Sequence, residues 1–148
     1  MRSITAIAAI LLGCIAAAST ASAQDRAARA KIPFGFYVSD RWVPAGTYTL
    51  TSESGSPNII TIRNADSTVS LLSAGHSKDQ PSRPNALVFK KYGDQYFLHE
   101  ISCSACGMNV EFPGSRRERL APVREAMMVP ATNVYLALTQ DMRRSHLH

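Results

Sequence analysis

The chain of 148 residues lacks most of the features that identify an enzyme or a membrane protein. Beyond the N-terminus, no apolar run reaches the roughly 20 residues that a membrane-spanning helix needs. There is no Gly-x-Ser-x-Gly motif, no His-Glu-x-x-His motif, no glycine-rich phosphate loop and no long internal repeat. Acidic residues are scattered, so no carboxylate pair suits acid–base catalysis. These absences favour a single non-enzymatic domain, as the length does.

The one long apolar stretch lies at the N-terminus and has the form of a signal peptide. Arg2 supplies a positive charge, residues 4–18 are uncharged and mostly apolar, and Ala21-Ser22-Ala23 ends the stretch. A basic start, a short apolar core and an Ala-x-Ala end are typical of secretory signals. We therefore expect cleavage after Ala23, with 1–23 as the signal peptide, and an exported protein that is periplasmic or extracellular.

The same stretch also allows a lipoprotein signal. Leu11-Leu12-Gly13-Cys14 resembles a lipobox, in which the cysteine becomes the acylated first residue. Against this, residues 15–18 continue the apolar run where a lipoprotein usually turns polar. Lipidation of Cys14 is therefore the alternative to secretion, and it would tether the domain to a membrane.

The charge of the chain is weakly positive. Sixteen Lys and Arg against 11 Asp and Glu give +5, and loss of Arg2 with the signal peptide leaves 15 − 11 = +4. On an exported domain this charge favours an anionic cell-envelope component or a small ligand as partner, although it also simply aids solubility. Without a recognition motif, nucleic acid is not expected as a partner, and the mature chain has no transmembrane segment.

Alternation of apolar and polar residues dominates the mature chain. Turns rich in Pro, Gly or Asn separate the alternating segments, and Gly93-Asp94 is the clearest hairpin signal. The expected strands cover residues 32–38, 47–51, 59–62, 68–73, 86–91, 95–101, 108–112 and 134–138. About eight short strands predict a mainly β fold, an antiparallel barrel or sandwich. We favour the barrel slightly, because no strand pair is protected as an edge.

The rest of the domain organisation follows from these strands. Residues 24–30 are expected to form a flexible segment, 31–140 a single β-domain and 141–148 a polar tail. Near the C-terminal side, Ser115 and Glu118 form a capping box that predicts one helix. Pro122 should keep this helix short. Residues 75–85 are expected to be the longest loop.

Two of the strand segments resemble a group of small exported bacterial proteins of unknown function. Residues 34–38 read F-G-F-Y-V and residues 43–48 read V-P-A-G-T-Y, which match that group's F-x-F-x-V strand and V-P-A-G-x-Y turn. Residues 87–98 and 115–118 resemble the group too, so the likeness covers most of 31–118. It implies export and a shared fold but no biochemical activity. The chain departs from the group at residues 103–107, which puts the role of its cysteines outside the resemblance.

Cys103-Ser104-Ala105-Cys106-Gly107 is the most specific chemical feature and is expected at a hairpin tip. In an oxidising compartment the two cysteines should form a structural disulfide. The alternative is a thiol-based redox or metal-binding module centred on Cys103 and Cys106. A redox site needs its first cysteine at a helix N-terminus, which the residues after Gly107 do not suggest. A metal site needs further ligands, for which only His99 and Met108 lie close in sequence. We therefore expect no metal and no cofactor.

Two further groups of side chains have both a functional and a structural interpretation. Arg116 and Arg119 lie at helical spacing and form either an anion-binding face or a solvated helix surface. Five aromatic residues either line a ligand cavity or form the core: Phe34, Phe36, Tyr48, Phe89 and Phe97. The sequence as a whole predicts an exported, non-catalytic β-domain with a binding or envelope-structural role, and the thiol module is the alternative.

Overall fold

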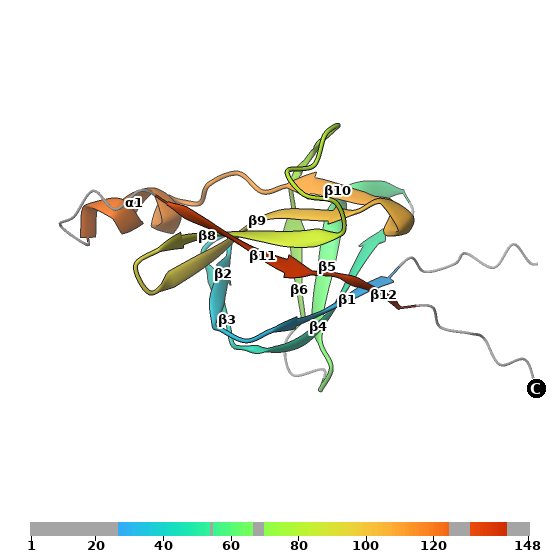
Figure 1. Ribbon diagram of the computed structural model, residues 1–148, viewed down its shortest axis with the longest axis horizontal. Coiled ribbons are helices and arrows are strands. Elements are labelled where there is room, and N and C mark those ends of the chain that lie inside the picture. The colour runs from blue at the N-terminus through green and yellow to red at the C-terminus, as the bar shows by residue number, and fades with distance from the viewer. Residues whose placement is uncertain (1–26, 54, 67–69, 125–130, 142–148) are drawn as a thin grey trace, which may run out of the picture.

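The computed structural model describes residues 27–53, 55–66, 70–124 and 131–141 (Figure 1). The protein is mainly β, with two curled sheets that form a half-barrel or sandwich, and a helix at one end. The expected signal peptide, the expected cleavage site after Ala23 and Cys14 lie outside the described residues.

Five antiparallel strands make up the first sheet. Their order is β12 (Thr139–Asp141), β1 (Ala27–Ile32), β4 (Gly46–Glu53), β5 (Ser56–Asn64) and β6 (Ser70–Ala74). The second sheet has the order β11 (Thr132–Ala137), β8 (Ala86–Tyr92), β9 (Gln95–Cys103), β10 (Met108–Glu111) and β7 (His76–Ser77). In addition, β2 (Phe36–Val38) runs parallel to β9 and pairs with β3 (Arg41–Val43).

Two bent strands pass from one sheet to the other. After Gly75, β6 of the first sheet continues as β7 of the second, and after Leu138, β11 of the second continues as β12 of the first. A side chain at Gly75 would overlap a Val110 methyl group and lie 2.7 Å from the Glu111 carbonyl oxygen. The bend therefore requires glycine. The strand order is that of a sandwich, and the shared bent strands curl it towards a barrel.

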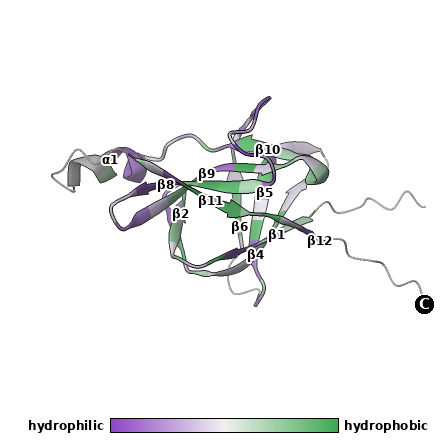
Figure 2. Ribbon diagram, in the orientation of Figure 1, coloured by the Kyte–Doolittle hydropathy of each residue, from purple (hydrophilic) through white to green (hydrophobic). Residues whose placement is uncertain are grey.

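The core between the sheets is built from the inward-facing side chains of the strands. Phe36 packs edge-on against Tyr48 and Phe89, with ring centroids 5.7 and 5.3 Å apart. Phe34 stacks on Tyr96 at 3.8 Å. Figure 2 shows apolar residues along the central strands and hydrophilic residues in the helix and at the β8–β9 turn. Of the five aromatic residues considered for a cavity, Phe34, Phe36, Tyr48 and Phe89 thus pack as core.

Tyr48 explains the V-P-A-G-T-Y run in structural terms. Its ring is fully buried, and its hydroxyl donates a 2.6 Å hydrogen bond to the Pro44 carbonyl oxygen. Burial raises the pKa of the Tyr48 hydroxyl, so this donor stays protonated. The motif therefore joins a turn to the core, and its residues need no ligand to account for them.

Two segment boundaries expected from the sequence are wrong. Residues 27–30 were expected in a flexible segment but belong to β1, between β4 and β12. Ala28 and Ala30 are small enough to face the core at alternate positions, and both are buried. At the other end, Asp141 belongs to β12 and pairs with Ala27. Residues 24–26 and 142–148 lie outside the described part of the chain.

One expected strand is divided in the structure, and the expected helix is longer than its proline suggested. The expected strand 32–38 is divided, because the chain leaves β1 at Pro33 and re-enters a sheet only at Phe36.

The helix α1 (Arg116–Arg124) begins as expected, with the Glu118 amide donating to the Ser115 hydroxyl at 3.1 Å. It continues two residues beyond Pro122, since a proline removes one amide donor without ending the helical path at once.

Candidate functional site

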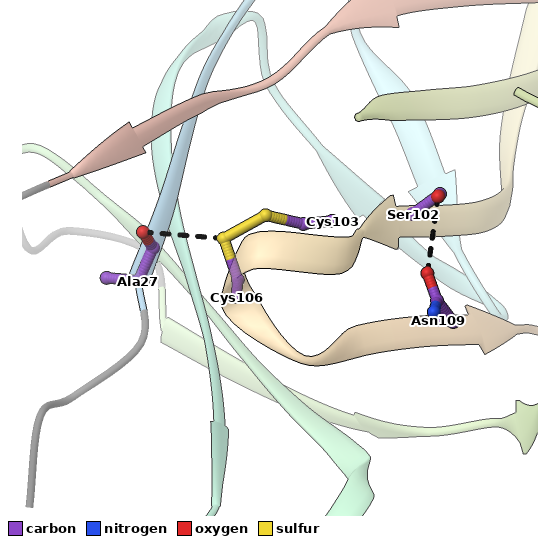
Figure 3. Close-up of a disulfide and its surroundings, with 5 residues drawn as sticks. All are labelled: Ala27, Ser102, Cys103, Cys106 and Asn109. Atoms are coloured by element: carbon purple, nitrogen blue, oxygen red, sulfur yellow. Dashed lines mark hydrogen bonds between the residues drawn. A yellow bond between two sulfur atoms is a disulfide. The ribbon is translucent and has the colours of Figure 1, made fainter. Parts of the chain in front are cut away.

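The cysteine pair closes the connection between β9 and β10 (Figure 3). Cys103 ends β9, one 3-10 turn (Ser104–Cys106) follows, and Gly107 takes a left-handed conformation with φ of 67° before β10. Cys103 and Cys106 are joined by a disulfide and are 3% and 1% exposed. The sulfur of Cys106 lies 3.8 Å from the Ala27 carbonyl oxygen, a packing contact because a disulfide sulfur carries no hydrogen.

This geometry favours the structural interpretation of the cysteines. Redox-active cysteines need an accessible thiolate, whereas both sulfurs lie in the core. Within the described residues, no three His, Cys, Asp or Glu side chains form a metal-binding group. His99 is four residues from Cys103 along β9, or roughly 13 Å at about 3.3 Å per residue. Met108 does lie opposite Cys103, but its side chain is part of the core.

A buried carboxylate, Glu100, lies at the centre of a polar cluster on the outer face of the second sheet. The Glu100 side chain is 0% exposed, although β9 places it on the face opposite the core. Its oxygens accept hydrogen bonds from Lys78 Nζ at 2.8 Å, the Ser82 amide at 2.7 Å and the Ser82 hydroxyl at 2.7 Å. All three donors come from residues 78–82, which we call the polar strap. The strap thereby covers part of the second sheet.

The charges of this cluster are fixed near neutral pH. Burial alone would raise the pKa of Glu100, but the hydrogen bonds from Lys78 and Ser82 together bring it below its ordinary value. The hydrogen bond to Glu100 raises the pKa of Lys78, which also contacts Glu111 at 3.0 Å. Both groups of the pair are therefore charged at pH 7.

The same charges argue against catalysis by Ser82. Its hydroxyl lies 3.2 Å from Lys78 Nζ, a spacing that resembles a serine–lysine pair. A general base must accept a proton near the working pH. Lys78 is held protonated and Glu100 is a weakened base, so neither suits that role. The cluster is best explained as the attachment of the strap.

His99 lies beside this cluster, where β8 and β9 change register. Its Nε2 atom is 3.7 Å from Glu111, and its buried Nδ1 atom has no hydrogen-bond partner among the described residues. Burial, and then the charge of Lys90, lower the pKa of His99, so the ring is neutral at pH 7. His99 is thus a partly buried side chain and lies away from the cysteines.

The arginines of α1 are arranged differently from the prediction. Arg119 turns back and donates a 2.9 Å hydrogen bond to the Gly114 carbonyl oxygen. Arg116 instead lines an open hollow of about 280 Å³ together with Arg117, Leu120 and Asp40. An Arg116–Arg119 face is therefore not formed around this hollow, since Arg117 is the second arginine there.

Two aromatic side chains of β2 and β3 lie on the Tyr37 side of Arg117, next to this hollow. Tyr37 and Trp42 are cross-strand neighbours, and the Arg117 guanidinium lies 4.9 Å from the centre of the Tyr37 ring. Trp42 is 60% exposed and lies over Gly35, where a Cβ would be 3.1 Å from the indole. We call Tyr37, Trp42, Arg116, Arg117 and Leu120 the aromatic–arginine surface.

The chain matches no protein-family model, no curated protein and no solved structure. No helix in the described part of the chain is long and apolar enough to cross a membrane. The candidate site is therefore defined by its geometry alone.

Neither the strap cluster nor the aromatic part of the surface was expected from the sequence. A signal for the first was present, because Glu100 is the one carboxylate of β9 and stands next to the apolar Ile101, and a charged residue buried in a strand is normally paired. A signal for the second was the only tryptophan of the chain, which follows Arg41 in a three-residue strand. What the sequence did not indicate is that α1 lies next to β2.

Proposed function

We propose that the protein is an exported, non-catalytic domain that binds an anionic glycan of the cell envelope through the aromatic–arginine surface. The observation that carries this proposal is the exposure of Trp42. Because tryptophan has the largest side chain, leaving it in water forgoes more favourable free energy of burial than leaving out a smaller side chain. Tryptophan and arginine are enriched at the residues that dominate binding interfaces. The indole rests over Gly35, and Tyr37 is its cross-strand neighbour, so its outer face is presented to solvent.

The charges around the hollow favour an anionic partner. Arg116 has no side-chain partner among the described residues, and Arg117 contacts the Tyr37 ring. The one carboxylate, Asp40, accepts a 3.0 Å hydrogen bond from the Arg117 amide. The hollow therefore carries two guanidinium groups and one carboxylate, which leaves an excess of positive charge. Guanidinium groups bind carboxylate and phosphate groups in a bidentate geometry.

A glycan suits the whole surface better than an isolated anion. The flat apolar face of Trp42 can cover the C–H face of a sugar ring, while the arginines contact acidic substituents on the next unit. Two features support the location. The N-terminal sequence has the form of a signal peptide, and buried disulfides are typical of oxidising compartments.

Trp42 also supplies the test, because it is the only tryptophan. The mature domain is titrated with polygalacturonate, an acidic polysaccharide, and with neutral dextran, while Trp42 emission and its quenching by acrylamide are recorded. We expect polygalacturonate to shift the emission to shorter wavelength and to reduce quenching. Dextran should have a much smaller effect.

Matched arginine variants locate the site. Arg116→Ala and Arg117→Ala should each weaken polygalacturonate binding, whereas Arg63→Ala, an exposed arginine of β5, should not. Unchanged emission with polygalacturonate, or an equal loss of affinity in all three variants, would contradict the proposal.

A further inference from the structure

We infer that β6 pairs with β6 of a second copy of the chain, antiparallel across a twofold axis. The two first sheets would then form one continuous ten-stranded sheet. This inference does not depend on the proposed function. It starts from the strand order, in which β6 ends the first sheet and has β5 as its only strand neighbour within the described residues.

The free edge of β6 lacks the usual protection. Edge strands are normally kept apart by charged residues, proline, bulges or short length. The sequence Ser70-Leu71-Leu72-Ser73-Ala74 has five residues and contains neither charge nor proline. The other terminal strands differ, since β3, β7 and β12 have two or three residues and β11 contacts β1.

Leu72 adds an apolar contact to this edge. Leu71 and Ser73 face inwards and are buried, while Leu72 points outwards and is 61% exposed, more than Trp42. Residues opposite each other in adjacent strands lie on the same face of a sheet. A twofold axis at Leu72 therefore places Leu72 opposite Leu72 of the second copy, with Ser70 opposite Ala74 on either side.

A second copy fits this edge because the edge complements itself. The pairing is isologous, so both strands contribute the same donors and acceptors and the same leucine. Charge does not oppose it. Arg63, the described charged residue that pairs with β6, lies opposite Ser70, away from the axis. A five-residue contact is smaller than a standard interface, so we expect a weak dimer in the micromolar to millimolar range.

Sedimentation equilibrium of the mature protein at about 5 to 500 µM tests the dimer. We expect a monomer–dimer equilibrium that Leu72→Lys weakens at least about tenfold, because two ammonium groups would face each other across the axis. The control is Tyr135→Lys, which places the same charge at an exposed position of β11. A monomer throughout this range, or equal effects of the two lysine variants, would overturn the inference.

Cross-linking tests the register. Cys103 and Cys106 are joined, so Leu72→Cys adds the only free thiol to a chain that begins at Gln24. Opposite residues of an antiparallel pair have Cα atoms about 4.5 to 5.5 Å apart, within disulfide range. Leu72→Cys should form a covalent dimer on oxidation. In Ala74→Cys the two thiols would lie roughly 13 Å apart, so the protein should stay monomeric. Equal cross-linking of both variants would refute this register.

Discussion

Replacing Lys78 with methionine should destabilise the fold strongly at neutral pH and weakly in acid. The variant keeps the aliphatic stem and removes the ammonium group that lies 2.8 Å from the buried Glu100 carboxylate. Removing one partner of a fully buried ion pair costs about 3 to 5 kcal/mol, and a hydrogen bond to a charged group contributes about 1.5 to 3 kcal/mol. Lys78 is 25% exposed and Ser82 keeps its two hydrogen bonds, so water and Ser82 offset part of the loss. We expect the free energy of unfolding to fall by about 2 to 3 kcal/mol.

The pH dependence follows from the lowered pKa of Glu100. A carboxyl group with a lower pKa in the folded than in the unfolded state stabilises the fold fully above its unfolded value, here 4.5. That contribution is lost as the pH falls through the folded pKa. The penalty of Lys78→Met should therefore shrink in acid, because protonation of Glu100 removes the charge that Lys78 compensates.

Urea denaturation at pH 7 and at about pH 2.5, followed by circular dichroism, measures this difference. Lys31→Met serves as the control, since Lys31 is exposed on β1 and its loss should cost less than about 0.5 kcal/mol at both pH values. The reasoning would be refuted by a penalty of equal size at both pH values, or by one as small as that of the control.

Three further substitutions test other parts of the structure. Tyr48→Phe should lower the free energy of unfolding in urea by about 1 to 3 kcal/mol, because a buried turn carbonyl loses its donor; no change would exclude that role. Cys103→Ala/Cys106→Ala should cost about 2 kcal/mol, the loop-closure value for four residues, and leave the fold intact by circular dichroism. Gly35→Ala should displace the indole of Trp42 and raise its quenching by acrylamide, and unchanged quenching would show that the ring does not rest on this position.

Local patterns predicted most strands because the cause of each strand is local. In β6 and β10, inward and outward residues alternate along the strand itself, and the Gly93-Asp94 turn alone accounts for the β8–β9 hairpin. The alternation also lies in β1, but its inward residues include two alanines, which contribute little to an apolar pattern. That is why the first strand was expected to begin only at residue 32.

The candidate site could not be predicted in this way because its parts meet through tertiary contacts. Arg117 reaches Tyr37 across 80 residues of sequence, and Ser82 reaches Glu100 across 18. Helical spacing suggested Arg119 as the neighbour of Arg116, yet the choice depends on how α1 lies against the β2–β3 turn. The spacing of residues on one helix contains no information about that contact.

The pairing of β1 with β12 has a consequence for how the molecule forms. Ala27 lies opposite Asp141, so β1 needs β12 to complete its pairing, and Figure 1 shows these two strands side by side. Synthesis proceeds from the N-terminus, so one edge of β1 stays unpaired until β12 has been made. Contacts between such distant residues slow folding and prolong the exposure of open strand edges. The first sheet should therefore form slowly, and only after β12 has been released.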